Sequence, residues 1–366
     1  MPTSEPVERF TLALEQLQLC RELLLDGSPA KARMAVILLD GLADAILYRR
    51  LERLYRVSEN EFVGLGPYGK DVRRQARNDF GKRVSLCSDP TADTFVSGGG
   101  GPLVTTDAAV VLRVGHSYRN AAYHRDRHNP ATIGAVGRVF FKAVAELFER
   151  SQFAGHTSGG LPVEQIESLR RLGVPVHGSS INWREAASTL AQELSAALAV
   201  PHAELVTQLA DDLVGRAAAV EELAAYVPGT RDEFDSSMAS LEFRDAHGAD
   251  EQLLDFGERR DPVRRSVVGN IPLTQELRDE GAVAERLYQE RLVELRRTWQ
   301  PRATMRSSTE ATDIAKQLRE ETETLHALTV YQGIDGKLDI LEDYSTHAVI
   351  EFDHYVDMQI EAARER

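Results

Sequence analysis

The stretch from His116 to Pro130 concentrates groups that can bind phosphate and transfer protons. It reads HSYRNAAYHRDRHNP and holds three histidines and three arginines, in a chain whose formal charge is −14. Within it, Arg119, Asn120 and His124 form the pattern R-N-x-x-x-H. Histidine titrates near neutral pH, and arginine presents a permanent charge in a fork that matches phosphate oxygens. Because asparagine can orient either group, the pattern predicts phosphate chemistry, with RNA cleavage as the reaction that needs no metal.

RNA cleavage of this kind needs a base for the ribose 2′-OH, an acid for the leaving oxygen and a cation for the phosphorane. Asn120 and His124 are four residues apart and share one face of a helix. Arg119 and His124 are separated by about 140° around the helix axis. One chain therefore offers one histidine and one arginine, and we expect a two-fold homodimer to bring two such sets together.

The pattern R-[N/H/D]-x-x-x-H, late in an N-terminal helical region, resembles the HEPN superfamily. The resemblance covers residues 1–155 and implies a helical bundle that dimerises around the motif. It also implies a metal-independent endoribonuclease without a cofactor, which leaves a 2′,3′-cyclic phosphate on its RNA substrate. Arg119, Asn120 and His124 match the motif and take its catalytic roles. Related proteins act as toxins or in antiviral defence, which implies a similar role here and an antitoxin or regulatory protein as a partner.

Five further residues are candidates for supporting this site. Asp40 and Asp44 lie one turn apart in an apolar run. Either of them orients a catalytic group across the bundle, as an acidic residue of an earlier helix does in HEPN proteins, or they face solvent or pair with an arginine. Tyr118 and Tyr123 either stack an unpaired base or pack inside the bundle. Arg125 adds a cation beside His124.

Two other functions compete with this interpretation. His116, His124 and His128 lie near one helical face and suggest zinc, but Arg125 stands where the H-E-x-x-H signature requires glutamate. We therefore expect no metal. The second competitor is a non-catalytic helical interaction or scaffold protein. Asp126 occupies the position of the tyrosine that is adenylylated in some HEPN toxins, so we do not expect control by that modification.

Periodic apolar residues predict an all-α chain with two regions. The first region is the bundle of residues 1–155, and the second is a regulatory or assembly region at 156–366 with a polar linker at about 228–272. In the bundle, a helix begins near Thr105 and includes the motif, and Asn129 and Pro130 begin the next one. Further helices are expected at 274–299, 308–327 and 341–365, with a short connection at 329–340.

Composition limits the classes of function. The chain has 366 residues, of which 42% are hydrophobic. Its acidic balance argues against broad, non-specific duplex binding but permits a small basic site. No apolar run approaches the roughly 20 residues of a membrane span, which predicts a protein with no membrane partner. Cys20 and Cys87 form no metal-binding pattern, and we expect two buried thiols in a cytoplasmic protein.

Overall fold

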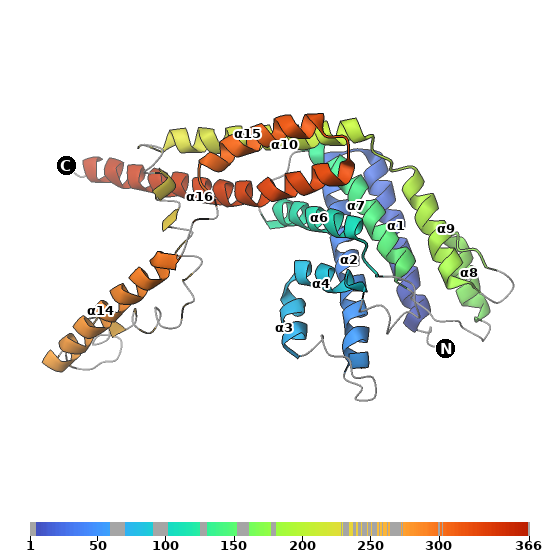
Figure 1. The fold of residues 1–366 in the computed structure, drawn as a ribbon, viewed down its shortest axis with the longest axis horizontal. Helices are drawn as coiled ribbons and strands as arrows, with labels where there is room; N and C mark the ends of the chain where they lie inside the picture. The colour runs from blue at the N-terminus through green and yellow to red at the C-terminus, as the bar shows by residue number, and fades with distance from the viewer. Residues whose placement is uncertain are drawn as a thin grey trace. The chain divides into compact units, whose positions relative to one another are not determined.

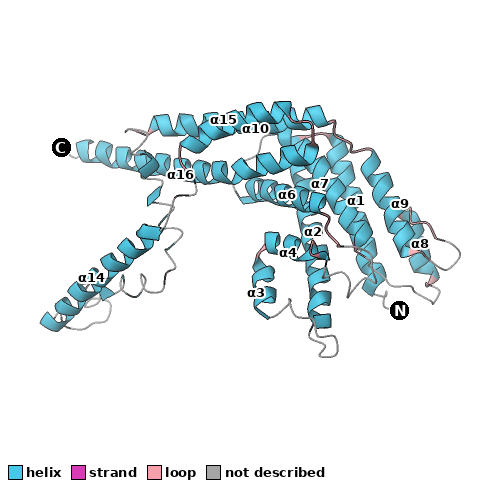
Figure 2. Ribbon diagram, in the orientation of Figure 1, coloured by secondary structure: helices cyan, strands magenta, loops and turns pink. Residues whose placement is uncertain are grey.

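The all-α prediction is confirmed by a computed structural model of the chain. All the regular secondary structure that it describes is helical (Figure 2). The structure describes residues 5–58, 70–90, 102–124, 130–151, 161–176, 181–227, 275–298, 301 and 303–364, together with scattered residues between 229 and 274. Most of the expected linker at 228–272 and the Gly-rich segment at 98–101 lie outside the described residues.

The chain forms two compact units. The first unit comprises Met1–Asp212 and Gln317–Gln332, and the second comprises Leu213–Lys316 and Gly333–Arg366. The first unit extends beyond the expected bundle of residues 1–155 because later helices pack onto it. Trp183 shows this directly, since its ring lies 5.0 Å from the ring of Phe10.

Four long helices build the core of the first unit (Figure 1). α2 contacts both α1 and α7, and α9 packs against α7. Phe10 and Phe148 join α1 to α7, with their ring centroids 5.1 Å apart. Both rings are buried, and burying side chains of this size is the main stabilising contribution to such a bundle. The bounds are α1 Glu5–Asp26, α2 Pro29–Ser58, α7 Pro130–Arg150 and α9 Trp183–Ala196.

α6, at Thr106–His124, carries the motif and packs against α2 and α7. Thr105 caps it, because its hydroxyl oxygen accepts a hydrogen bond of 3.1 Å from the backbone N–H of Ala108. Gly115 lets α6 approach α7 closely, since a Cβ atom at this position would lie 2.4 Å from the Phe140 ring. Pro130 is the first residue of α7, as expected, and Asn129 lies outside the described residues.

The basic segment that follows α2 forms two short helices, α3 at Lys70–Asn78 and α4 at Phe80–Cys87. Asp79 separates them and caps α4, accepting a 2.8 Å hydrogen bond from the backbone N–H of Lys82. α4 contacts both α2 and α6. Phe80 and Arg83 are therefore brought beside the two helices that hold the candidate site. The remaining helix bounded within the first unit is α8 at Val163–Arg171.

Three helices, α10 at His202–Tyr226, α15 at Arg306–Glu320 and α16 at Thr324–Arg364, contribute to both units, and α14 at Gln275–Thr298 belongs to the second. The expected connection at 329–340 is wrong, because α16 continues through it. Its two glycines, Gly333 and Gly336, suggested a break, but Ile334, Leu338 and Leu341 are buried along this segment. Burial of such side chains outweighs the roughly 1 kcal/mol that each glycine costs in a helix. None of the described helices is long and apolar enough to cross a membrane.

Candidate functional site

Two of the three motif residues touch each other on the last turns of α6. Arg119 donates a hydrogen bond of 2.9 Å from Nη1 to the side-chain oxygen of Asn120. Both side chains are partly buried, and the Arg119 guanidinium also lies 5.2 Å from the centre of the Tyr123 ring. The arginine fork is thereby fixed by its neighbours on the same helix.

Asp40 of α2 lies at the centre of the site. Its side chain is only 5% exposed, and its two oxygens contact two different partners on α6. Oδ2 lies 3.3 Å from Nε of Arg119, and Oδ1 lies 2.8 Å from Nδ1 of His116. The Arg119 contact is an ion pair without the alignment of a hydrogen bond. Of the two roles considered for Asp40, the structure shows the one in which it holds groups across the bundle.

His116 is the residue of this site whose contacts the sequence did not predict. Its ring stacks on Phe80 of α4, with centroids 4.1 Å apart and planes only 5° from parallel. An ionised carboxylate accepts hydrogen bonds only, so Nδ1 of His116 is the donor to Asp40. In the neutral ring, Nε2 then carries the lone pair that can accept a proton. Its spacing of three residues from Arg119 was the available signal, because residues three apart share a helical face.

Asp44 lies one turn after Asp40 but contacts a different partner. Its Oδ1 atom lies 2.6 Å from Nε of Arg83, whose side chain is 9% exposed. Arg83 also donates from Nη1 to the carbonyl oxygens of Ala76 and Arg77, at 2.6 and 2.8 Å. Asp44 thus pairs with an arginine, which was the structural alternative, and ties α2 to the junction of α3 and α4.

The two candidate tyrosines differ in exposure. Tyr118 is buried, and its hydroxyl lies 3.0 Å from that of Tyr331, which donates a 2.6 Å hydrogen bond to Asp212. This polar chain belongs to the packing of the first unit, so the Tyr118 ring offers no open face to a base. Tyr123 is 59% exposed and lies beside Arg119. Tyr123 therefore keeps the stacking role as a prediction.

His124 is the last residue of α6, and Arg125 lies outside the described residues. Asn120 precedes His124 by one helical turn. The backbone thus places the third motif residue at the end of the helix that holds Arg119 and Asn120. Within the described part of the chain, no three His, Cys, Asp or Glu side chains gather as a metal site would require.

No protein-family model, curated protein or solved structure matches the chain. The chemistry must therefore be derived from the site itself. One buried carboxylate is shared by an arginine and a histidine on α6. Donor groups exceed acceptor groups in this cluster, so the cluster can take an additional anion. A phosphate group has the charge and the oxygen atoms that such a cluster binds.

Proposed function

We propose that the chain is a HEPN-type, metal-independent endoribonuclease that acts as a homodimer. The observation that carries this proposal is the cluster on α6, in which Arg119 is held by Asn120 and by the buried Asp40. This arrangement fixes a phosphate-binding fork one turn from His124. A role as a toxin or in antiviral defence, with an antitoxin or regulatory partner, is part of the same proposal.

In the proposed reaction, the ribose 2′-oxygen attacks the adjacent phosphorus. The 2′-O–P bond forms as the P–O5′ bond breaks, and the products are a 2′,3′-cyclic phosphate and a 5′-hydroxyl. A base takes the proton of the 2′-OH, and an acid gives a proton to the departing 5′-oxygen. No water or metal enters this balance. DNA lacks the 2′-OH and cannot react in this way.

Each residue has a defined role in this reaction. Arg119 stabilises the charge that develops on the phosphorane, and Asn120 keeps its guanidinium in place. His124 transfers a proton. His116, oriented by Asp40, is a second imidazole of the same chain and supplies the other proton transfer or positions the phosphate. Tyr123 stacks an unpaired base beside the arginine.

The test is cleavage of purified RNA by the full chain in EDTA, with the products analysed for 2′,3′-cyclic phosphate ends. We expect cleavage of RNA, none of the matched DNA, and loss of turnover in His124→Ala. His347→Ala is the matched control, because His347 is an exposed histidine of the second unit and contacts only Glu351 among the described residues. Cleavage at the parental rate by His124→Ala, or cleavage that EDTA abolishes, would contradict the proposal.

The homodimer is tested separately, by light scattering during size-exclusion chromatography. We expect the mass of two chains at the concentrations at which RNA is cleaved. A monomer with full activity would remove the dimer from the proposal and leave both proton transfers to His116 and His124 of one chain.

A further inference from the structure

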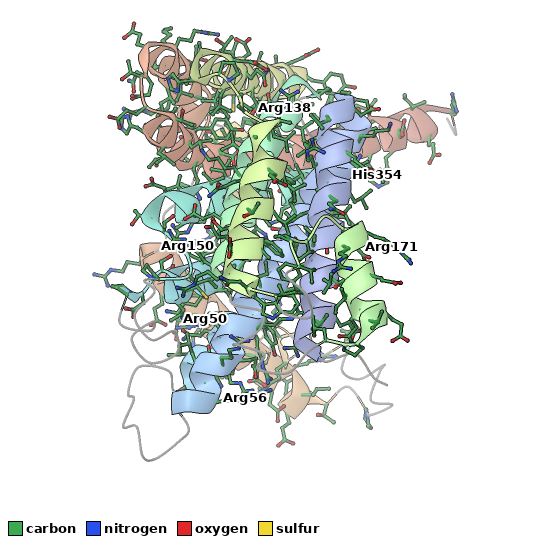
Figure 3. All side chains as sticks on the ribbon, turned by 90° about the vertical axis from the view of Figure 1, so that its right-hand side faces the viewer. Arg50, Arg56, Arg138, Arg150, Arg171 and His354 are labelled. Atoms are coloured by element: carbon green, nitrogen blue, oxygen red, sulfur yellow. The ribbon has the colours of Figure 1, made fainter. Side chains whose placement is uncertain are left out.

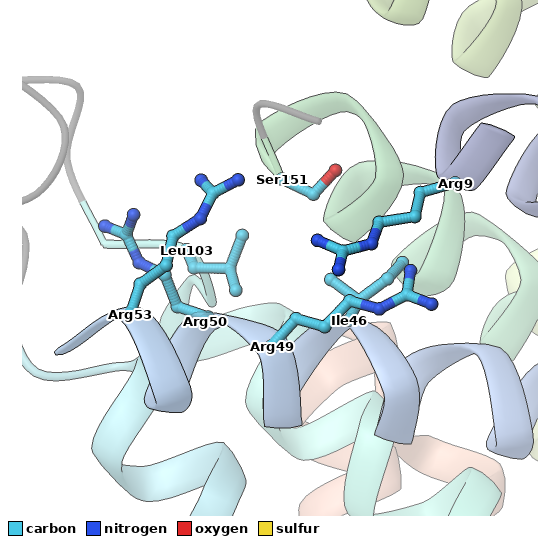
Figure 4. A pocket seen from close by; sticks show the side chains of 7 residues that line it. All are labelled: Arg9, Ile46, Arg49, Arg50, Arg53, Leu103 and Ser151. Atoms are coloured by element: carbon cyan, nitrogen blue, oxygen red, sulfur yellow. The ribbon is translucent and has the colours of Figure 1, made fainter. Parts of the chain in front are cut away.

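A second group of cations surrounds a pocket at another part of the first unit. Arg9 of α1 lies across from Arg49, Arg50 and Arg53 of α2, and Ser151 follows the end of α7 at the rim (Figure 4). Ile46 and Leu103, both buried, form the apolar part of the wall. The pocket encloses about 380 Å³, part of which is open to solvent. None of the described residues that line it is an aspartate or a glutamate.

The arginines of this pocket lie close enough to repel one another. The pKa of Arg49 is lowered by the loss of surrounding water and by the charge of Arg9. The pKa of Arg53 is lowered by the loss of surrounding water and by the charges of Arg50 and Arg9. Arg50 is 8% exposed and is therefore a cation withdrawn into the protein. An anion in the pocket would relieve this repulsion.

The lining indicates which anion fits. Arginine pairs with phosphate through two parallel hydrogen bonds, so four guanidinium groups can engage more oxygens than one phosphate presents. The limited volume and the apolar wall suit a small ligand. An extended RNA backbone is disfavoured, because tracking it requires a broad cationic surface and this chain has a formal charge of −14.

We propose that this pocket binds a compact anion with at least two linked phosphate groups, as in pyrophosphate or the phosphate tail of a nucleoside triphosphate. The pocket is separate from the Arg119 cluster in its residues, because it shares none of the side chains that contact Asp40. Binding here is independent of the proposed ribonuclease activity and is measured without it.

The experiment is isothermal titration of the full chain with sodium pyrophosphate at constant ionic strength. We expect one saturable site per chain. The double variant Arg49→Ala/Arg53→Ala removes two exposed side chains, and each lost charged contact should weaken binding by about tenfold or more. The Arg49→Gln/Arg53→Gln pair keeps most of the side-chain volume and repeats the test if the alanine variant unfolds.

Arg56→Ala is the matched control. Arg56 is an exposed arginine of α2, three residues after Arg53, and does not line the pocket. Figure 3 shows its place on α2 relative to Arg50. We expect pyrophosphate affinity within about twofold of the parent in this control, because a remote surface charge contributes little at moderate salt. The Arg119→Ala variant should also bind pyrophosphate normally, which separates this pocket from the candidate active site.

Titration with ATP distinguishes the two sources of linked phosphates. Tighter binding of ATP than of pyrophosphate assigns the pocket to a nucleotide, and the reverse assigns it to the free anion. The proposal is overturned if neither ligand binds saturably, or if the double variant and the Arg56→Ala control lose affinity equally. It is also overturned if a single-stranded RNA oligonucleotide binds the pocket and neither pyrophosphate nor ATP displaces it.

Discussion

Arg119 in the first unit and Arg216 in the second are both held by carboxylates, but in opposite proportions. Arg216 contacts three of them, with Asp335, Asp339 and Glu342 at 2.5, 2.7 and 2.6 Å. Arg119 contacts one carboxylate at 3.3 Å and shares it with His116. The donors of Arg216 are saturated by its own chain, which suits a structural tie. Arg119 has fewer acidic partners and is suited to an additional anion.

The largest expected effect removes the saturated arginine. Arg216→Ala leaves three neighbouring carboxylates, with Arg216 itself only 18% exposed in the parent. Breaking a buried pair by deleting one partner costs about 3 kcal/mol or more of unfolding free energy. Urea denaturation should show this loss, and RNA cleavage by the folded fraction should stay unchanged.

Arg319→Ala is the control for that variant. Its single ion pair with Asp211 is exposed on both sides, so its removal should change the unfolding free energy by less than about 1 kcal/mol. Equal losses in the two variants would show that the number of carboxylates around Arg216 does not matter.

The next effect tests the close approach of α6 to α7. Gly115→Ala forces a methyl group against the Phe140 ring, and overpacking of this kind costs about 2 kcal/mol. Because His116 follows directly, we expect cleavage to fall along with the melting temperature. Gly41→Ala is the control, since a Cβ atom there meets no described atom within 4 Å. A Gly115→Ala protein with parental stability would contradict this packing.

A smaller effect addresses the shared carboxylate. Asp40→Asn keeps the side-chain shape but removes the charge that Arg119 and His116 share. We expect cleavage to fall by about tenfold, comparable to the loss of one charged hydrogen bond. If Asp40 acts through His116, the double variant with His116→Gln should be no slower than His116→Gln alone. Additive losses would instead assign Asp40 a role of its own.

The smallest effect concerns the two thiols. Burial raises the pKa of Cys20 and of Cys87 to about 12, and the nearby Arg50 and Arg83 offset this only partly at Cys87. At pH 8 we expect iodoacetamide to label neither thiol in the folded chain and both in urea. Since these thiols titrate near 9 in the unfolded chain, their contribution to stability is complete below pH 9 and decreases as the pH rises toward 12. Rapid labelling of the folded protein would contradict the burial.

Local signals in the sequence predicted the helices around the site but did not predict its contacts. The capping residue Thr105 and the first-turn Pro130 were predicted from residue type alone, and the helices there begin as expected. The contact between Asp40 and His116 joins residues 76 positions apart, and helical spacing says nothing of partners on other helices. The stacking of Phe80 on His116 depends in the same way on how α4 packs. Tertiary burial likewise explains why α16 continues through Gly333 and Gly336.

The central claim is that Arg119 is available to phosphate, and Arg119→Ala tests it most directly. The measurement is the rate of RNA cleavage in EDTA, compared with Arg113→Ala. Arg113 is the matched control, because it lies on the same helix and contacts Ser85 rather than Asp40. We predict a loss of about 100-fold or more for Arg119→Ala, as for other groups that stabilise a transition-state anion, with little change for Arg113→Ala. Equal rates in the two variants, with both proteins folded, would contradict the proposed role of Arg119.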